Sequence, residues 1–344
     1  MPVLTESTLK EKLRSTPTGA YLIYGDEDYL KKVYVDRIIS KTVDKSFEDF
    51  NLHVFDGNET VLGDVYDSAQ AFPVMSETNC VVVKDMPLDT LDTGDIALLN
   101  ELLSDLPDSC ALVFCMVSRS VSGEKWKKII NAFDTYGSVV KLDKKEKNDL
   151  VRTIEKGAEK RGTLFGNGVA SYLISCVGSD LNTVINETDK LCSYAKGRTV
   201  TKEDVDALCP KTLEAKVFDI TKALHAGRFS IAQQKLSNVI AQKEDPLMIL
   251  GAFIMSYTDM YRVRAAVTAG KRAEDVAKLY NYSGKVFRLT NAQRESHGLS
   301  LSSIYSCIEL LAEADRMMKS SSVSKTLILE QTLARLAIYE GNDR

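Results

Sequence analysis

AYLIYGDEDYLK, residues 20–31, decides how the first part of the chain folds. An apolar run is followed by a turn at Gly25 and then by the start of a helix, which is the strand–turn–helix context of a P-loop. A P-loop has the pattern GxxxxGK[ST], in which the lysine contacts the β- and γ-phosphates and the hydroxyl binds magnesium. Both residues are missing here, and the acids Asp26, Glu27 and Asp28 would repel a triphosphate. The stretch therefore predicts a nucleotide-binding type of domain that does not bind nucleotide, as in a structural member of a molecular machine.

The length and charge of the chain indicate a soluble protein of several domains. A chain of 344 residues is long enough for two or three domains with sizeable cores. The apolar runs are far too short to span a bilayer and no signal peptide is visible, so we expect a cytoplasmic protein. Residues 1–143 carry 14 Lys and Arg against 24 Asp and Glu, whereas residues 144–344 carry 30 against 24. This asymmetry favours an anionic partner for the second part, although plain solvated surfaces also carry such excesses.

Cysteine and histidine patterns give no metal site, cofactor site or disulfide framework. The seven cysteines are scattered without a CxxC pair and mostly lie within apolar runs, which is typical of buried, reduced thiols. Three histidines lie far apart, with no cysteine close to them in the sequence. We therefore expect no bound metal and no cofactor, and no set of catalytic residues is recognisable.

Apolar runs alternate with helical patterns over the first part of the chain. Several runs are continuously apolar, as expected for strands that are covered on both faces. Strand–helix alternation of this kind predicts a mostly parallel, doubly wound α/β sheet over residues 1–142. The expected strands are Tyr21–Tyr24, Leu52–Phe55, Cys80–Lys84, Ala111–Met116 and Ser138–Leu142, with helices at Tyr29–Ser40 and Asp95–Leu106.

The rest of the chain reads as helices only. Residues 143–210 form a small helical domain, in which Thr201 and Asp204 have the spacing of a capping box. Residues 211–344 contain one proline and continue as helix after helix, including Leu247–Val267 and Leu327–Tyr339. No fixed-period repeat is visible, so a solenoid is not expected.

Three stretches, taken in order, resemble one known family. They are YLIYGDEDYLKKVYVDRI at 21–38 with HVFDG at 53–57, GSDLNTVINETDKLCSYAKGRTVTKEDV at 178–205 leading into VFDITKALHAG at 217–227, and EADRMMKSSSVSKTLILEQTLARLA at 313–337. In order and spacing they resemble the delta subunits of bacterial DNA polymerase III clamp loaders. The likeness extends over nearly the whole chain.

The resemblance implies a fold, a function and partners. Residues 1–142 would be a degenerate AAA+ RecA-like domain, 143–210 a helical lid, and 211–344 a helical collar that assembles with other subunits. The protein would grip the ring-shaped sliding clamp and open it, while ATP is hydrolysed by other subunits. Its partners would be the clamp, ATP-binding motor subunits, a delta-prime-like subunit and primer–template DNA, with no membrane.

The same resemblance assigns a clamp-binding loop. The family holds a short hydrophobic plug just before the third strand, and Phe72, Pro73, Val74 and Met75 align with it. Val74 and Met75 align with the pair that usually inserts into the clamp. An apolar wedge stiffened by proline loses little entropy on docking. The alternative is that Phe72 and Met75 simply cover the edge of the sheet.

A basic segment near the end of the chain is a candidate for DNA contact. Residues 271–294 hold six basic residues against two acids, interleaved with aromatic residues. Basic side chains neutralise phosphates and aromatic rings can stack on bases. We expect Lys285, Arg288 and Arg294 to contact primer–template DNA, with a solvated helix face as the alternative.

Two other functions stay open at the level of sequence. One is an active P-loop NTPase, which saturable ATP binding by this chain would support. The other is a helical scaffold or DNA-binding module unrelated to replication, which salt-dependent DNA binding without clamp affinity would support.

Overall fold

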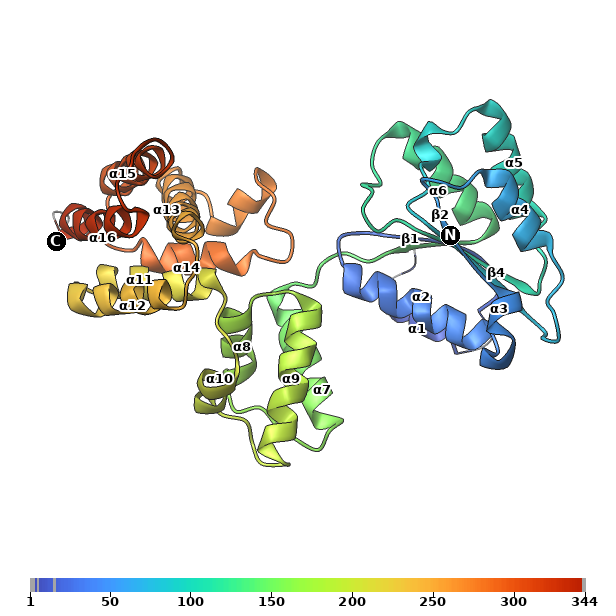
Figure 1. Ribbon diagram of the computed structural model, residues 1–344, viewed down its shortest axis with the longest axis horizontal. Helices are drawn as coiled ribbons and strands as arrows, with labels where there is room; N and C mark the ends of the chain where they lie inside the picture. The colour runs from blue at the N-terminus through green and yellow to red at the C-terminus, as the bar shows by residue number, and fades with distance from the viewer. Residues whose placement is uncertain (1–3, 5, 15–16, 342–344) are drawn as a thin grey trace. The chain divides into compact units, whose positions relative to one another are not determined.

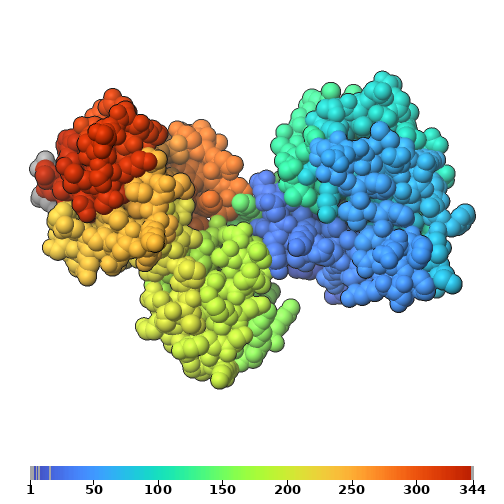
Figure 2. Space-filling view, viewed as in Figure 1, coloured from blue at the N-terminus to red at the C-terminus, as the bar shows by residue number. Residues whose placement is uncertain are grey.

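The computed structural model describes residue 4, residues 6–14 and residues 17–341. The chain forms two compact units, Met1–Lys144 and Lys145–Arg344 (Figure 1). The first unit contains every strand of the sheet, and the second is helical. In the space-filling view, the first unit is coloured blue to green and the second green to red (Figure 2). Apart from residues 143 and 144, the helical regions expected at 143–210 and 211–344 fall in the second unit, and their separation into lid and collar stays a prediction.

The first unit is built on a five-stranded parallel sheet with the strand order β2-β3-β4-β1-β5. In register, Tyr21 of β1 lies opposite Val113 of β4 on one side and Ser138 of β5 on the other. The expected parallel, doubly wound sheet is confirmed. The strands are β1 Gly19–Tyr24, β2 Leu52–Asp56, β3 Asn79–Lys84, β4 Cys110–Cys115 and β5 Ser138–Lys141.

Helices cover both faces of this sheet, which explains why the central strands are continuously apolar. The helix α2 contacts β3 and β4 from one face, and α4 contacts the same strands from the other face, beside α5 and α6 (Figure 1). Trp126 of α6 is buried in the core between this second layer and the sheet. The helices of the unit are α1 Glu6–Lys12, α2 Asp28–Thr42, α3 Glu48–Asn51, α4 Leu62–Gln70, α5 Thr93–Ser104 and α6 Glu124–Tyr136, with 3₁₀ turns η1 Lys45–Phe47 and η2 Leu88–Thr90.

The second unit is a set of helices whose ends carry the expected caps. Asp180 accepts a hydrogen bond from the backbone of Thr183, and Thr201 with Asp204 forms the predicted capping box. Its elements are α7 Lys147–Glu159, α8 Val169–Val177, α9 Leu181–Ala195, α10 Lys202–Leu208, α11 Leu213–His225, α12 Phe229–Ala241, α13 Pro246–Thr268, η3 Ala273–Lys278, α14 Phe287–Glu295, α15 Leu301–Ser320 and α16 Lys325–Gly341.

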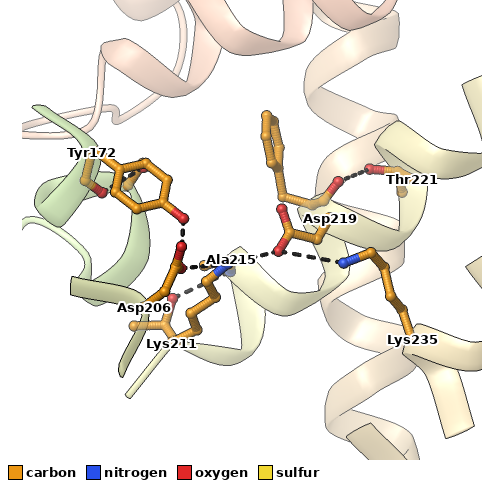
Figure 3. A network of polar contacts seen from close by, with 10 residues as sticks. Tyr172, Asp206, Lys211, Ala215, Asp219, Thr221 and Lys235 are labelled. Atoms are coloured by element: carbon orange, nitrogen blue, oxygen red, sulfur yellow. Dashed lines mark hydrogen bonds and ion pairs between the residues drawn. The ribbon is translucent and has the colours of Figure 1, made fainter. Parts of the chain in front are cut away.

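Within the second unit, a polar network joins α8 and α10 to the helices that follow (Figure 3). Tyr172 of α8 donates a hydrogen bond of 2.6 Å to Asp206, which lies at the end of α10. The ammonium of Lys211 lies 3.6 Å from Asp206 and 3.0 Å from Asp219 of α11, and Lys235 of α12 lies 4.0 Å from the same Asp219. Opposite charges therefore alternate along the connection between the first four helices of the unit and the rest.

All seven cysteines are buried and form no disulfide, as expected from the sequence. Burial disfavours the thiolate and raises the pKa of Cys80 and of Cys110 to about 12. These side chains act as small apolar core residues. In the described part of the chain, no helix combines the length and the hydropathy that crossing a membrane requires.

Candidate functional site

The turn between β1 and α2 lies where a nucleotide would bind in a protein of this topology. The chain leaves β1 toward β2 on one side, while the connection after β4 crosses to β5 on the other side. Ligands of open parallel sheets bind in the crevice at such a switch point, outside the carboxyl ends of the strands. The crevice here lies between the ends of β1 and β4.

Gly25 holds this turn against the end of β5. Its φ is +120°, and a Cβ added there would lie 2.3 Å from the carbonyl oxygen of Leu142. The same carbonyl accepts a hydrogen bond of 2.9 Å from the backbone of Glu27, and the N–H of Leu142 donates to Tyr24 at 2.8 Å. Only glycine fits this approach without strain. The N–H of Glu27 is thus used inside the fold and does not point at a ligand.

Lys31 of α2 fills the crevice with its own positive charge. Its side chain is 2% exposed, and its ammonium donates to the carbonyl oxygens of Gly25, Met116 and Val117 at 2.8, 2.9 and 3.0 Å. It also lies 2.9 Å from the carboxylate of Asp28. An ammonium has three donors, so these partners saturate it. The carboxyl ends of β1 and β4 are therefore joined by an internal cation.

At the end of β3, Asp85 likewise bonds the segment that follows β4. Its carboxylate accepts hydrogen bonds from the backbone of Val117 at 2.7 Å and from the backbone and hydroxyl of Ser118 at 2.9 and 2.8 Å. Burial would raise the pKa of Asp85, but these hydrogen bonds outweigh it and hold the pKa below its ordinary value. Arg119 donates back to the Asp85 carbonyl at 2.7 Å and to Asn58 at 2.6 Å. The polar groups after β3 and β4 are thus paired with one another.

Metal ligands do not gather anywhere in the part of the chain that the structure describes. No group of three or more His, Cys, Asp and Glu side chains is arranged there to hold a metal ion. The acids Asp26, Glu27 and Asp28 follow one another in sequence, but Glu27 is buried and Asp28 is paired with Lys31.

The predicted clamp-binding residues lie together on the loop between α4 and β3, residues 71–78. Phe72 is 93% exposed, Met75 81% and Val74 44%, while Pro73 is half-buried. The two largest side chains therefore face solvent and do not cover the edge of the sheet. Met75 adopts a left-handed backbone with φ of +52°, which is uncommon for a residue with a side chain.

A buried asparagine that sequence reasoning missed lies beneath this loop. Asn51, the last residue of α3, has no exposed surface, and its side chain bonds the backbone of Val74. The partners are separated by 23 residues, so no local pattern could have revealed the contact.

The three predicted DNA-contacting residues have different surroundings. Lys285 and Arg294 are exposed, and Arg294 donates to Asn291 at 3.2 Å. Arg288 instead binds the buried carboxylate of Asp259 through two nitrogens at 3.0 and 2.6 Å. Arg288 is therefore part of an internal ion pair, whereas Lys285 and Arg294 face solvent.

Sequence reasoning also missed a stacked pair close to this basic segment. The guanidinium carbon of Arg262 on α13 lies 3.8 Å from the ring centroid of Tyr280, which is partly exposed. Arg262 lies several residues before the basic segment, so the charge pattern of residues 271–294 gives no sign of it. Tyr282 of the same segment is buried and donates to Asp259.

Known proteins match the chain over both units. The family model described as "DNA polymerase III, delta subunit" matches residues 21–157, and "DNA polymerase III delta subunit, C-terminal domain" matches residues 214–336. The DNA polymerase III subunit delta of Bacillus subtilis (strain 168) is 26% identical over 327 residues, which are 92% of this chain and 92% of that protein. Among solved structures, the Bacillus subtilis DNA clamp loader delta protein matches with a TM-score of 0.70 and 23% identity, over 96% of this chain and 98% of that one.

Fold and matches together define what kind of protein this is. A parallel sheet in the order β2-β3-β4-β1-β5, with helices on both faces and a helical second unit, defines an AAA+-like protein. The crevice between the carboxyl ends of β1 and β4 contains the side chain of Lys31. Within this class, the chain belongs to the family of DNA polymerase III delta subunits, because models of both parts of that family match it and together cover more than half of its length. The resemblance found in the sequence is confirmed.

Replacing Lys31 by methionine tests the internal cation. Lys31→Met removes the donor of three carbonyl groups in a buried crevice, and we expect the free energy of unfolding to fall by roughly 3 kcal/mol. Denaturant unfolding measures this change. Lys32→Met is the matched control, since Lys32 is exposed on the same helix, and should change stability by less than about 0.5 kcal/mol. Equal stability of the two variants would contradict the assigned role of Lys31.

Proposed function

We propose that this chain is the clamp-loader subunit that binds the sliding clamp of DNA polymerase III and helps to open it. The observation that carries the proposal is the loop between α4 and β3, where Phe72 and Met75 are 93% and 81% exposed. Membership of the delta family supports a role within a replication complex. The solved relative is described as a clamp-loader protein, which agrees with this role.

The loop has the physical properties of a binding plug. Two large apolar side chains on a short loop bury much surface when they enter a pocket, and such anchors dominate the energy of many interfaces. Methionine also adapts its shape to an irregular pocket. Pro73 restricts the backbone between α4 and Met75, so little entropy is lost on docking. The resemblance aligns Val74 and Met75 with the inserting pair. We propose Phe72 and Met75 instead, because they are more exposed than Val74.

The same proposal assigns no ATP hydrolysis to this chain. The turn after β1 lacks the lysine and hydroxyl of a P-loop, and the crevice beside it holds the ammonium of Lys31. Motor subunits of the same complex would then bind and hydrolyse ATP. Clamp opening follows from differential affinity: a subunit that binds the open ring better than the closed ring shifts the ring toward the open state.

Assembly with the other subunits is assigned to the helices of the second unit, which would serve as collar, with residues 143–210 as lid. Three leucines of α16, Leu329, Leu333 and Leu336, are buried in the core of the unit itself. Leu327 and Ile338 of the same helix are exposed and are the apolar groups that α16 offers to a partner. The complex would act in the cytoplasm on primer–template DNA.

Contact with DNA is a second function that a specific observation favours. Lys285 and Arg294 are exposed cations, and the stacked pair Arg262–Tyr280 adds a cation and a partly exposed ring to the second unit. We assign Lys285 and Arg294 to phosphate contacts. Arg288, although predicted with them, is held by Asp259, so its contact with DNA would require that ion pair to open.

Clamp binding provides the first test. We expect Phe72→Ala/Met75→Ala to weaken binding of the sliding clamp by roughly 2 kcal/mol or more, about 30-fold, because the two anchors are lost. Surface-based binding to the clamp of the same organism measures it, with melting temperature as a check on folding. The control is Ile96→Ala, which removes a partly exposed apolar side chain from α5. Unchanged affinity of the double variant would place the plug elsewhere.

Salt dependence provides the test for DNA. In the assembled loader, Lys285→Ala/Arg294→Ala should weaken binding of primer–template DNA and reduce the slope of log affinity against log salt by about 2. Lys125→Ala/Lys128→Ala is the matched control, since it removes two exposed charges from α6 of the first unit. If both double variants keep the salt slope of the parent loader, Lys285 and Arg294 lie on a solvated face and do not contact DNA.

A further inference from the structure

The middle of the exposed loop is held by the side-chain carboxamide of Asn51. Asn51 is fully buried at the end of α3. Its Nδ2 donates to the carbonyl of Val74 at 2.8 Å, and its Oδ1 accepts from the N–H of Val74 at 2.7 Å. The Nδ2 also donates to the carbonyl of Phe47 at 3.1 Å. One side chain thus satisfies both backbone polar groups of Val74, as a paired strand would.

Two further contacts fix the ends of the same loop. Asn79, at the start of β3, donates from its side chain to the carbonyl of Ala71 at 3.1 Å. The hydroxyl of Thr78 donates to the carbonyl of Thr42 at the end of α2. With the ends tied down in this way, the bonds of Asn51 decide the path of the middle of the loop.

The pinned backbone of Val74 determines where its neighbours point. Phe72 and Met75 extend into solvent on either side of it. Met75 stays in a left-handed conformation, which costs energy and persists only where the surroundings impose it. The neighbouring hydrogen bonds of Val74 are the contacts that can impose it, because Met75 itself is largely exposed.

We infer that Asn51 is a positioning residue for clamp binding. Its carboxamide holds the loop in the conformation that presents Phe72 and Met75, so that the entropy of ordering the loop is lost on folding and not on docking. This inference rests on the proposed function. Asn51 itself does not contact the clamp: it acts through the backbone of Val74.

A double-mutant cycle separates this role from general stability. We expect Asn51→Ala to weaken clamp binding about 10-fold or more, since two hydrogen bonds to Val74 are lost and the loop becomes mobile. Because it acts through the plug, Met75→Ala should then cost clearly less in the Asn51→Ala background than in the parent chain. Asn100→Ala is the control, an exposed asparagine of α5 whose side chain donates to the backbone carbonyl of Ile96 in the same helix.

The outcomes are distinct. Suppose that the parent chain binds the clamp. The inference is then overturned if Met75→Ala weakens binding equally in both backgrounds, or if Asn51→Ala does not weaken binding at all. Either result would leave the proposed function intact. No binding by the parent chain would instead count against the proposed function. The unsubstituted protein gives a second measurement if the Asn51 variant fails to fold. Its Val74 amide should exchange with deuterium slowly, and rapid exchange would overturn the inference.

Discussion

The buried ammonium of Lys31 is the interaction on which the first unit depends. It binds three carbonyl oxygens from the ends of β1 and β4, at the point of the sheet where related folds place phosphate. A cation in this crevice needs partners, because burying an unpaired charge costs free energy. The carbonyls of Gly25, Met116 and Val117 supply them. These bonds tie the carboxyl ends of β1 and β4 together through a side chain of the unit itself.

The loop between α4 and β3 is the surface of this unit to which we assign clamp binding. This loop lies at the opposite, amino-terminal side of β3, where the strand begins at Asn79. Its apolar tips are exposed while its backbone is bonded to Asn51 and Asn79. A rigid backbone with exposed apolar side chains combines low entropic cost with large buried area on docking. In the proposed function, the fold thus orders this loop before the clamp binds.

Much of the architecture could be predicted from the sequence, whereas the site geometry could not. The strands at 80–84 and 111–116 are legible because a strand covered on both faces is continuously apolar. Lys31 gave no such signal, since its partners Met116 and Val117 are backbone groups more than 80 residues away. Arg288 was predicted to contact DNA from its local charge, but Asp259, 29 residues earlier, binds it.

The same limit applies to the proposed clamp-binding loop. Phe72 and Met75 could be located by resemblance and by their apolar character, but exposure had to come from the structure. Asn51 looks like an ordinary polar residue between Phe50 and Leu52, and only the fold brings it under Val74. Long-range hydrogen bonds to backbone leave no periodic trace in a sequence, so they are the part of a site that sequence reasoning misses.

Hydrogen–deuterium exchange of the full chain, with and without the sliding clamp, tests the central claim most directly. The account predicts that clamp binding slows exchange of the backbone amides at 71–78, while the amides around Lys31 keep the same protection. Protection that appears on other segments, with none at 71–78, would contradict the assignment of this loop as the clamp-binding site.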